Sequence, residues 1–236
     1  LGLIGMISTF GMLGRTATLH VYAQKKKKKM LQTQMEMFCT GLEFQVEFHP
    51  VDTTTHQIIY EDKSLSIETI PLEHRIPCCG YLFREKPTLP HIRRDVIDFY
   101  EIPISQINNI KNGTDWITVE GELIPNKRLT LPSEAPRSYA YCSDTRYMPS
   151  LSKQLKNVTM LYHESTYDEQ NKQRAKMFYH STAAQAATVA RDANVNTLLL
   201  GHYSARYDDE FALLKEAKNI FPNSHLSNEG DIFDVK

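Results

Sequence analysis

Three short apolar runs in the second half of the chain each end at a residue that can bind a metal ion or carry a proton. The runs are Tyr139–Ser143, Thr159–Tyr162 and Thr197–Leu200, and they lead into Asp144, Glu164 and His202. Uninterrupted apolar runs of this length are typical of buried strands. A titratable residue at the end of a buried strand is held rigidly beside a cleft. The three strand ends therefore predict one shared site.

The rest of the chain shows weaker strand and helix patterns. Strands are expected at Thr18–Tyr22, Phe44–Phe48, Leu65–Ile70, 78–83, Lys127–Leu131 and 227–235. Helices are expected at Leu1–Leu13, 30–38, 92–100, Pro149–Leu155, Thr182–Ala193 and Asp208–Ile220. The helix over 182–193 has the strongest propensity, and Ser181 or Thr182 can cap its start. In the last helix, Phe211, Leu214 and Ile220 share one face.

Length and composition bound the class of protein. A chain of 236 residues suits one large domain or two small ones, and it can bury a proper core. With 27 basic and 28 acidic residues, the net charge gives no sign of a nucleic-acid partner, and only a local basic patch would indicate one. The four cysteines lack metal-type spacing, which favours reduced thiols in a cytoplasmic protein. No apolar run is long enough to span a membrane.

Two stretches are rich in basic residues. Lys25–Lys29 is a run of five lysines, which is more often a solvated surface than a phosphate contact. The segment at about 84–113 is irregular and contains three prolines together with Arg93, Arg94 and Lys111. We interpret this segment as an excursion from the core and not as a separate domain.

Three residues have side chains that bind transition metals. His74 lies in P-L-E-H-R-I-P, a break between two strands that its prolines stiffen, while Asp144 and His202 follow buried strands. Imidazole and carboxylate groups suit zinc or manganese, and one carboxylate can bridge two cations. Two cations can activate water and stabilise charge on a phosphoryl group. No H-x-H or H-E-x-x-H pair accompanies these residues, so the residue types alone leave this interpretation open.

Longer strings connect these residues to a known family. Five strings follow one another along the chain: P-L-E-H-R-I-P-C-C-G-Y-L-F, Y-C-S-D-T-R, H-E-S-T-Y, Y-H-S-T-A-A-Q-A-A-T-V-A-R and G-H-Y-S-A-R-Y. Together they resemble ribonuclease Z, the tRNA 3′-processing endonuclease family of the metallo-β-lactamase superfamily. The opening G-L-I-G-M-I-S-T-F-G-M-L-G-R resembles the helix that follows that family's main metal motif.

The resemblance implies an α/β fold, the αββα metallo-β-lactamase sandwich, with the chain forming a single domain over 1–236 that lacks its N-terminal part. The family's H-x-H-x-D-H motif lies just upstream of the opening string, whereas this chain starts at Leu1. We therefore expect the chain to be the remainder of a longer protein. Because that motif supplies most of the metal ligands, we also expect the chain as written to be metal-poor and inactive.

The resemblance also assigns roles at the site. It implies two divalent metal ions per subunit, zinc or else manganese, with His74 on one ion, His202 on the other and Asp144 bridging both. His180 matches a residue beside the scissile phosphate, and Glu164 matches the carboxylate that supports it. Glu164 has a second interpretation as a strand-end surface residue, and its neighbour His163 is interpreted as structural.

Seven further residues are candidates for substrate binding: Ser181, Thr182, Arg206, Tyr207, Arg93, Arg94 and Lys111. The first two open a helix whose N–H groups can hold phosphate, although a simple capping role is the alternative. Arg206 can neutralise phosphate or can instead pair with Asp208 or Asp209. The basic residues of the excursion lie where many relatives carry an arm that clamps the tRNA elbow, but the glycine-rich string of that arm is missing.

The function implied by the resemblance is a zinc-dependent endoribonuclease that removes the 3′ trailer from precursor tRNA. His180 is expected to assist the leaving 3′ oxygen as an acid or to steady the phosphate. A cytoplasmic homodimer without a membrane association is expected. The alternatives are a general phosphodiesterase of the same fold and a non-catalytic RNA-binding relative that lacks the metal motif.

Overall fold

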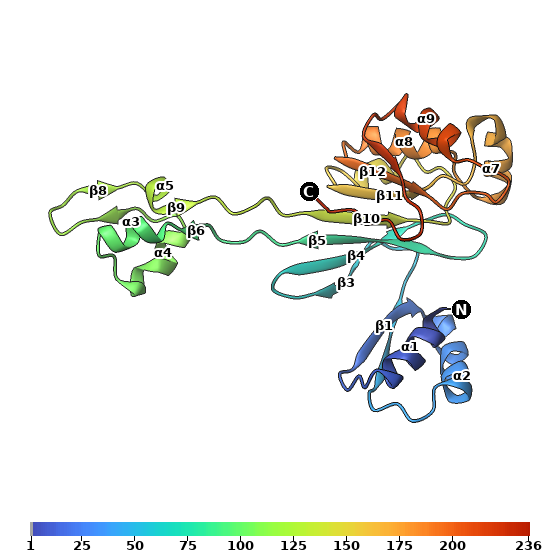
Figure 1. Ribbon diagram of the computed structural model, residues 1–236, viewed down its shortest axis with the longest axis horizontal. Helices are drawn as coiled ribbons and strands as arrows, with labels where there is room; N and C mark the ends of the chain where they lie inside the picture. Colours follow the sequence, from blue (N-terminus) through green and yellow to red (C-terminus); the bar gives the residue numbers. More distant parts are fainter. Residues whose placement is uncertain (1) are drawn as a thin grey trace.

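The largest element of the computed structural model, which describes residues 2–236, is a seven-stranded mixed sheet (Figure 1). In spatial order its strands are β13 (Ser224–Leu226), β12 (Thr197–Gly201), β11 (Met160–Glu164), β10 (Ser138–Cys142), β5 (Cys79–Glu85), β4 (Leu65–Pro71) and β3 (Ile58–Glu61). Strands β10 to β13 pair in parallel, and β10, β5, β4 and β3 pair antiparallel. The parallel strands share one carboxyl edge, and the residues that follow them gather there.

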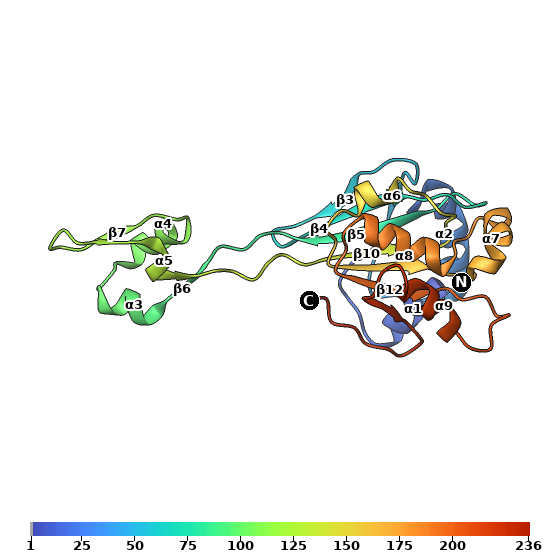
Figure 2. The same ribbon diagram turned by 90° about the horizontal axis from the view of Figure 1, so that it is seen from above.

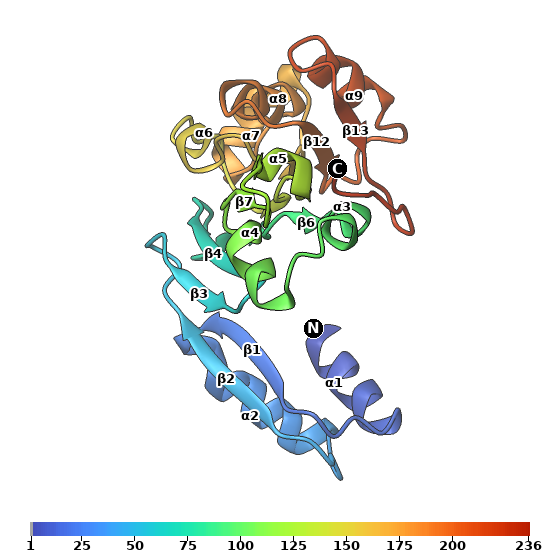
Figure 3. The same cartoon turned by 90° about the vertical axis from the view of Figure 1, so that its left-hand side faces the viewer.

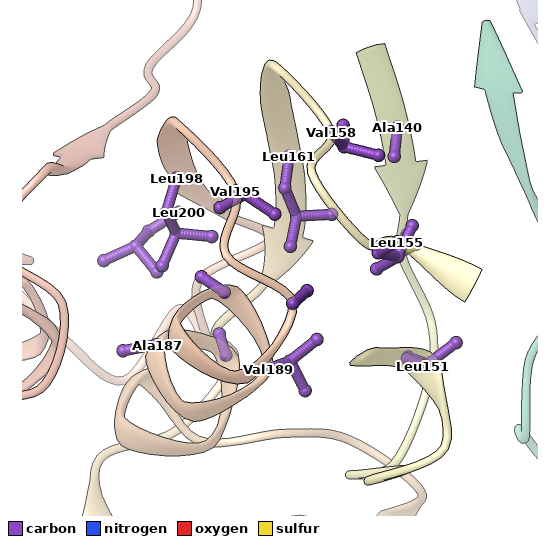
Figure 4. Close-up of a cluster of buried hydrophobic side chains, with 14 of the residues drawn as sticks. Ala140, Leu151, Leu155, Val158, Leu161, Ala187, Val189, Val195, Leu198 and Leu200 are labelled. Atoms are coloured by element: carbon purple, nitrogen blue, oxygen red, sulfur yellow. The ribbon is translucent and has the colours of Figure 1, made fainter. Parts of the chain in front are cut away.

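Helices pack on the parallel half of this sheet (Figures 1 and 2). They are α6 (Leu151–Gln154), α8 (Ala183–Asp192) and α9 (Phe211–Lys218), with α7 (Lys172–Phe178) leading into α8. Strand residues such as Leu161 and Leu198 meet Val189 and the alanines of α8 in the main core, which Figure 4 shows. Because alanine side chains are short, α8 lies close to the sheet and fixes the loop that precedes it.

The N-terminal residues form a smaller unit with a sheet of its own (Figure 3). It contains α1 (Gly2–Met12), β1 (Leu19–Gln24), α2 (Lys28–Phe38) and β2 (Val46–Val51), and β1 pairs with β2 in parallel. Leu1, the first residue of the helix expected over 1–13, lies outside the described residues. The lysine run forms a 3₁₀ turn (Lys25–Lys27) and the start of α2, and its side chains are exposed.

Residues 86–137 project from the sheet as an extended arm between β5 and β10 (Figure 1). The arm contains β6 (His91–Ile92), α3 (Arg94–Phe99), α4 (Ile107–Lys111), β7 (Trp116–Ile117), β8 (Leu123–Ile124), α5 (Asn126–Leu129) and β9 (Thr130–Leu131). Five buried residues form a small core at its end: Ile97, Ile102, Ile110, Ile124 and Leu129. The expected excursion at 84–113 covers only the outward half of this arm, because residues 116–131 return and complete the core.

Three expectations about elements were wrong. The final strand expected at 227–235 is not a strand, and β13 instead lies at Ser224–Leu226, where Ser224 is paired with Leu198. The strand expected at 127–131 is largely helix α5. In the last expected helix Leu213 and Ala217 are buried and Leu214 and Ile220 pack against the core as expected, but Phe211 is 66% exposed. Within residues 2–236, no helix has the length and apolarity needed to cross a membrane.

Candidate active site

The carboxyl edge of the parallel strands brings the predicted site residues together. Asp144 follows β10, Glu164 ends β11 and His202 follows β12 directly. His74 reaches the same edge from the loop between β4 and β5, and His180 from the loop between α7 and α8. Two groups of side chains of types that bind metals result, each with its possible donor atoms within 4.8 Å of one another: His74, Asp144 and His180, and Glu164, His180 and His202.

Asp144 and His202 face each other directly, with His202 Nε2 3.2 Å from Asp144 Oδ1. Both residues have left-handed backbone conformations, with φ of 58° and 59°, which non-glycine residues adopt rarely. Such strained residues persist only where the surrounding structure holds them, and they concentrate at functional sites. His74 Nδ1 lies 3.0 Å from the carbonyl oxygen of Tyr179 and must donate to it, so its Nε2 remains free.

Glu164 lies fully buried at the centre of the site. Its carboxylate accepts hydrogen bonds from Thr145 N (2.5 Å), Thr166 Oγ1 (2.6 Å) and Ser181 N (3.0 Å). It also lies 3.0 Å from His180 Nδ1. Burial opposes ionisation of the carboxyl group, but the hydrogen bonds from His180 and Thr166 outweigh it and lower the pKa of Glu164. A surface position for Glu164, one of its two sequence interpretations, is therefore wrong.

His180 is oriented by Glu164 on one side and by two other imidazoles. Its ring stacks on His202, with centroids 5.2 Å apart, and lies 5.0 Å from the ring of His74. The hydrogen bond to Glu164 raises the pKa of His180, although burial works in the opposite direction. Since Nδ1 donates to the carboxylate, Nε2 is the nitrogen available to a bound molecule.

Two of the residues predicted to bind substrate are buried in the protein. Ser181 Oγ donates to the carbonyl oxygen of Thr145 (2.8 Å). Thr182 caps α8 in a capping box with Gln185, and its hydroxyl also donates to Glu169. Both side chains have no exposed surface, so neither hydroxyl faces solvent. The capping interpretation of Thr182 is confirmed.

Arg206 and Tyr207 lie on the loop after β12. Arg206 packs over the ring of Tyr167, 5.3 Å from its centroid, and its Nε donates to Ser204 Oγ. No ion pair joins it to Asp208 or Asp209 among residues 2–236, so that alternative is wrong. The hydroxyl of Tyr207 accepts a hydrogen bond from Asp168 N (2.9 Å).

The basic residues of the arm are separated from the site along the length of the molecule (Figure 1). Arg93 precedes α3 and forms an ion pair with Asp95 at 2.9 Å, Arg94 is exposed at the start of α3, and Lys111 ends α4. The structure therefore does not bring these residues to the group around His180.

Sequence reasoning missed two parts of the site. Thr166, within the H-E-S-T string, contacts Glu164, His180 and His202 with one hydroxyl. A cavity of about 570 Å³ opens beside His180, and its wall includes three basic residues, Arg146, Lys172 and Lys176. The H-E-S-T-Y string contains Thr166 and the Y-C-S-D-T-R string ends at Arg146, whereas Lys172 and Lys176 lie outside all five strings.

Comparisons with known proteins agree with this architecture. No family model matches the chain. Human tRNase Z, short form, superposes with a TM-score of 0.62 at 18% identity, covering 100% of this chain and 74% of that one. The metallo-beta-lactamase fold protein YhfI from Bacillus subtilis superposes with a TM-score of 0.59 at 15% identity over 98% of this chain and 70% of that one. The fold is therefore that of the metallo-β-lactamase proteins.

Sequence similarity narrows this class to one family. Ribonuclease Z from Bacteroides fragilis is 53% identical over 97% of this chain and 75% of its own length. Ribonuclease Z from Porphyromonas gingivalis is 46% identical over the same shares. The chain belongs to the ribonuclease Z family, as the resemblance predicted, and it spans about three quarters of the length of these relatives.

Proposed function

We propose that this protein is a metal-dependent endoribonuclease that removes the 3′ trailer from precursor tRNA. One observation carries the proposal: the Glu164–His180 pair adjoins His74, Asp144 and His202 at a single sheet edge. This arrangement occurs in a chain that is 53% identical to a ribonuclease Z. An acid–base pair beside a metal-binding group suits hydrolysis of a phosphodiester.

The residues present fit a divalent metal ion. Thr166 Oγ1 lies 2.6 Å from Glu164 Oε2, 2.9 Å from His202 Nδ1 and 3.0 Å from the carbonyl oxygen of His202, so this hydroxyl holds His202 in place. His202 Nε2 and Asp144 Oδ1 lie 3.2 Å apart, which is close to the separation of two ligands that share one cation.

We assign His74, Asp144 and His202 as residues that would hold two divalent ions, zinc being the first choice and manganese the alternative. Ions bound there supply Lewis acidity that activates water and offsets phosphate charge. His180 holds a proton at Nε2 for the leaving 3′ oxygen of the RNA. Glu164, ionised and buried, orients His180 and stabilises its protonated form.

We assign substrate contacts according to whether each candidate side chain is exposed or buried. We assign Arg206 on the loop after β12 and the basic residues of the arm, Arg93, Arg94 and Lys111, to phosphates of the RNA. Tyr207 positions this loop through its bond to Asp168. Ser181 and Thr182, being buried, hold the loop that carries His180 and do not touch RNA. A cytoplasmic homodimer remains a prediction, which light scattering of the purified protein and its localisation in cells test.

The proposal predicts that in the full-length protein Asp144→Ala abolishes cleavage while the protein stays folded, because Asp144 groups with His74 and lies 3.2 Å from His202. Zinc content by atomic absorption and cleavage of a precursor tRNA are measured together, with Asp209→Ala as the control at an exposed carboxylate. Zinc and turnover both fall in Asp144→Ala and stay unchanged in the control. Normal zinc and a normal rate in Asp144→Ala would contradict the assignment.

A further inference from the structure

The sheet of the N-terminal unit has two faces of different character. Val21 and the segment Val46–Phe48 line a cavity together with residues of α1 and α2, so the side chains of Val21, Val46 and Phe48 are turned toward the helices. Side chains alternate along a strand, and the opposite face therefore carries His20 and Tyr22 from β1 and Glu47 and His49 from β2. The register pairs His20 with Glu47 and Tyr22 with His49.

Three of these side chains direct nitrogen and oxygen atoms toward one another. His20 Nδ1 lies 2.9 Å from His49 Nε2 and 3.4 Å from Glu47 Oε2. His49 Nε2 lies 3.8 Å from Glu47 Oε1. Ligands about 2.0–2.1 Å from a tetrahedral ion lie about 3.3 Å apart, so these separations of 2.9–3.8 Å surround the value that zinc requires.

We propose that His20, Glu47 and His49 form a second metal site, distinct from the candidate active site, for a divalent transition-metal ion such as zinc. Two imidazoles and one carboxylate are the ligand types that zinc accepts, and three protein ligands leave the fourth position to water. The two imidazole nitrogens at 2.9 Å must share a proton in the metal-free protein. The ion takes the place of that proton and links β1 to β2.

The surroundings keep this group in place and accessible. The ring of His49 stacks on Tyr22 with centroids 4.5 Å apart and an angle of 15°, which fixes the direction of its Nε2. The side chains of His20, Glu47 and His49 are 49%, 58% and 31% exposed, so an ion reaches them from solvent. Parallel pairing over six residues of each strand holds their backbones at a constant spacing.

Zinc binding to the whole chain tests the proposal. Zinc alone is titrated in competition with a chromophoric chelator into the Asp144→Asn chain, in which the candidate active site is weakened. The same titration follows for that chain carrying His20→Gln and His49→Gln. The parent should bind one zinc equivalent that the triple variant has lost. Equal stoichiometry and equal affinity in both proteins would overturn the proposal.

A matched control separates this site from any exposed imidazole near a carboxylate. His56 is 47% exposed and lies 2.7 Å from Glu68 Oε2, without a second imidazole among the described residues around it. His56→Gln should keep the zinc equivalent. If the triple variant does not fold, histidine NMR of the Asp144→Asn chain decides the question: one equivalent of zinc must shift His20 and His49, and unshifted resonances reject the site.

Discussion

At the residue scale, the arrangement of the candidate active site depends on the hydrogen bonds that the buried carboxylate of Glu164 accepts. Glu164 has no exposed surface, and an isolated charge there would cost several kcal/mol. Donors from Thr145, Thr166, Ser181 and His180 compensate for that burial. The bond between Glu164 and His180 also fixes the orientation of the imidazole ring. The same hydrogen-bond network therefore stabilises the buried carboxylate and orients His180.

His180→Ala should lower the turnover number about 10²- to 10⁴-fold, which is the usual contribution of a general acid. Zinc content and tRNA affinity should stay nearly unchanged, because His180 is assigned to the leaving oxygen and not to a metal ion. The loss should shrink on a nitrophenyl phosphodiester, whose leaving group needs no proton. The measurements are single-turnover rates on both substrates and atomic absorption.

The other roles for His180 give different results. As a metal ligand, its removal would lower zinc content and slow both substrates equally. As a loop residue without a chemical role, its removal would leave both rates unchanged. His225→Ala, at an exposed histidine of β13, provides the control for general effects of losing an imidazole.

At the element scale, the start of α8 supports the loop that carries His180. The Thr182 side chain accepts from Gln185 N, and the Gln185 side chain accepts from Thr182 N. A capping box of this kind satisfies backbone N–H groups that a helix start otherwise leaves unpaired. α8 in turn packs on the sheet through four buried alanines and Val189, so its position is fixed independently of any ligand.

Thr182→Ala should therefore lower the free energy of unfolding by about 1 kcal/mol, the typical cost of removing a cap. Thr182→Ser, which keeps the hydroxyl, should restore most of it. Urea denaturation followed by circular dichroism measures both. The affinity for tRNA should be the same in all three proteins, and a large loss of affinity in Thr182→Ala at unchanged stability would instead favour the substrate-binding role.

At the scale of the whole molecule, Arg206 lies on the loop that carries His202, whereas the other basic residues assigned to RNA lie on the arm, away from the chemistry. The arm of residues 86–137 holds Arg93, Arg94 and Lys111 far from the sheet edge, and the exposed run Lys25–Lys29 lies on the N-terminal unit (Figure 1). A net charge of -1 therefore does not describe these individual basic residues, which lie in separate parts of the molecule. A long RNA that reaches several of them at once releases counterions from each contact.

Affinity for precursor tRNA should fall steeply with salt despite the near-zero net charge. Removing one phosphate contact, as in Arg94→Ala, should lower the slope of log affinity against log salt by about one. Fluorescence anisotropy between low and high salt measures the slope, with Lys218→Ala on α9 as the control. An affinity independent of salt would show that phosphate contacts do not hold the RNA.

The sequence by itself determined the parallel half of the sheet. The strands expected at 139–143, 159–162 and 197–200 and the helix at 182–193 are present, because a continuous apolar run or a strong helix propensity is local information. The same patterns placed Asp144, Glu164 and His202 at strand ends. Longer strings of residues also predicted the family correctly.

Only the tertiary structure decided how those residues are used. The burial of Glu164 and Ser181, the hydroxyl that Thr166 shares between three side chains, and the left-handed backbone at Asp144 and His202 result from contacts distant in sequence. The arm was underestimated for the same reason, since its core joins residues 97–110 to residues 124–129. The sequence pattern indicates which face of a helix or strand is apolar. Tertiary packing decides which elements contact that face and which polar atoms remain available to bind a ligand.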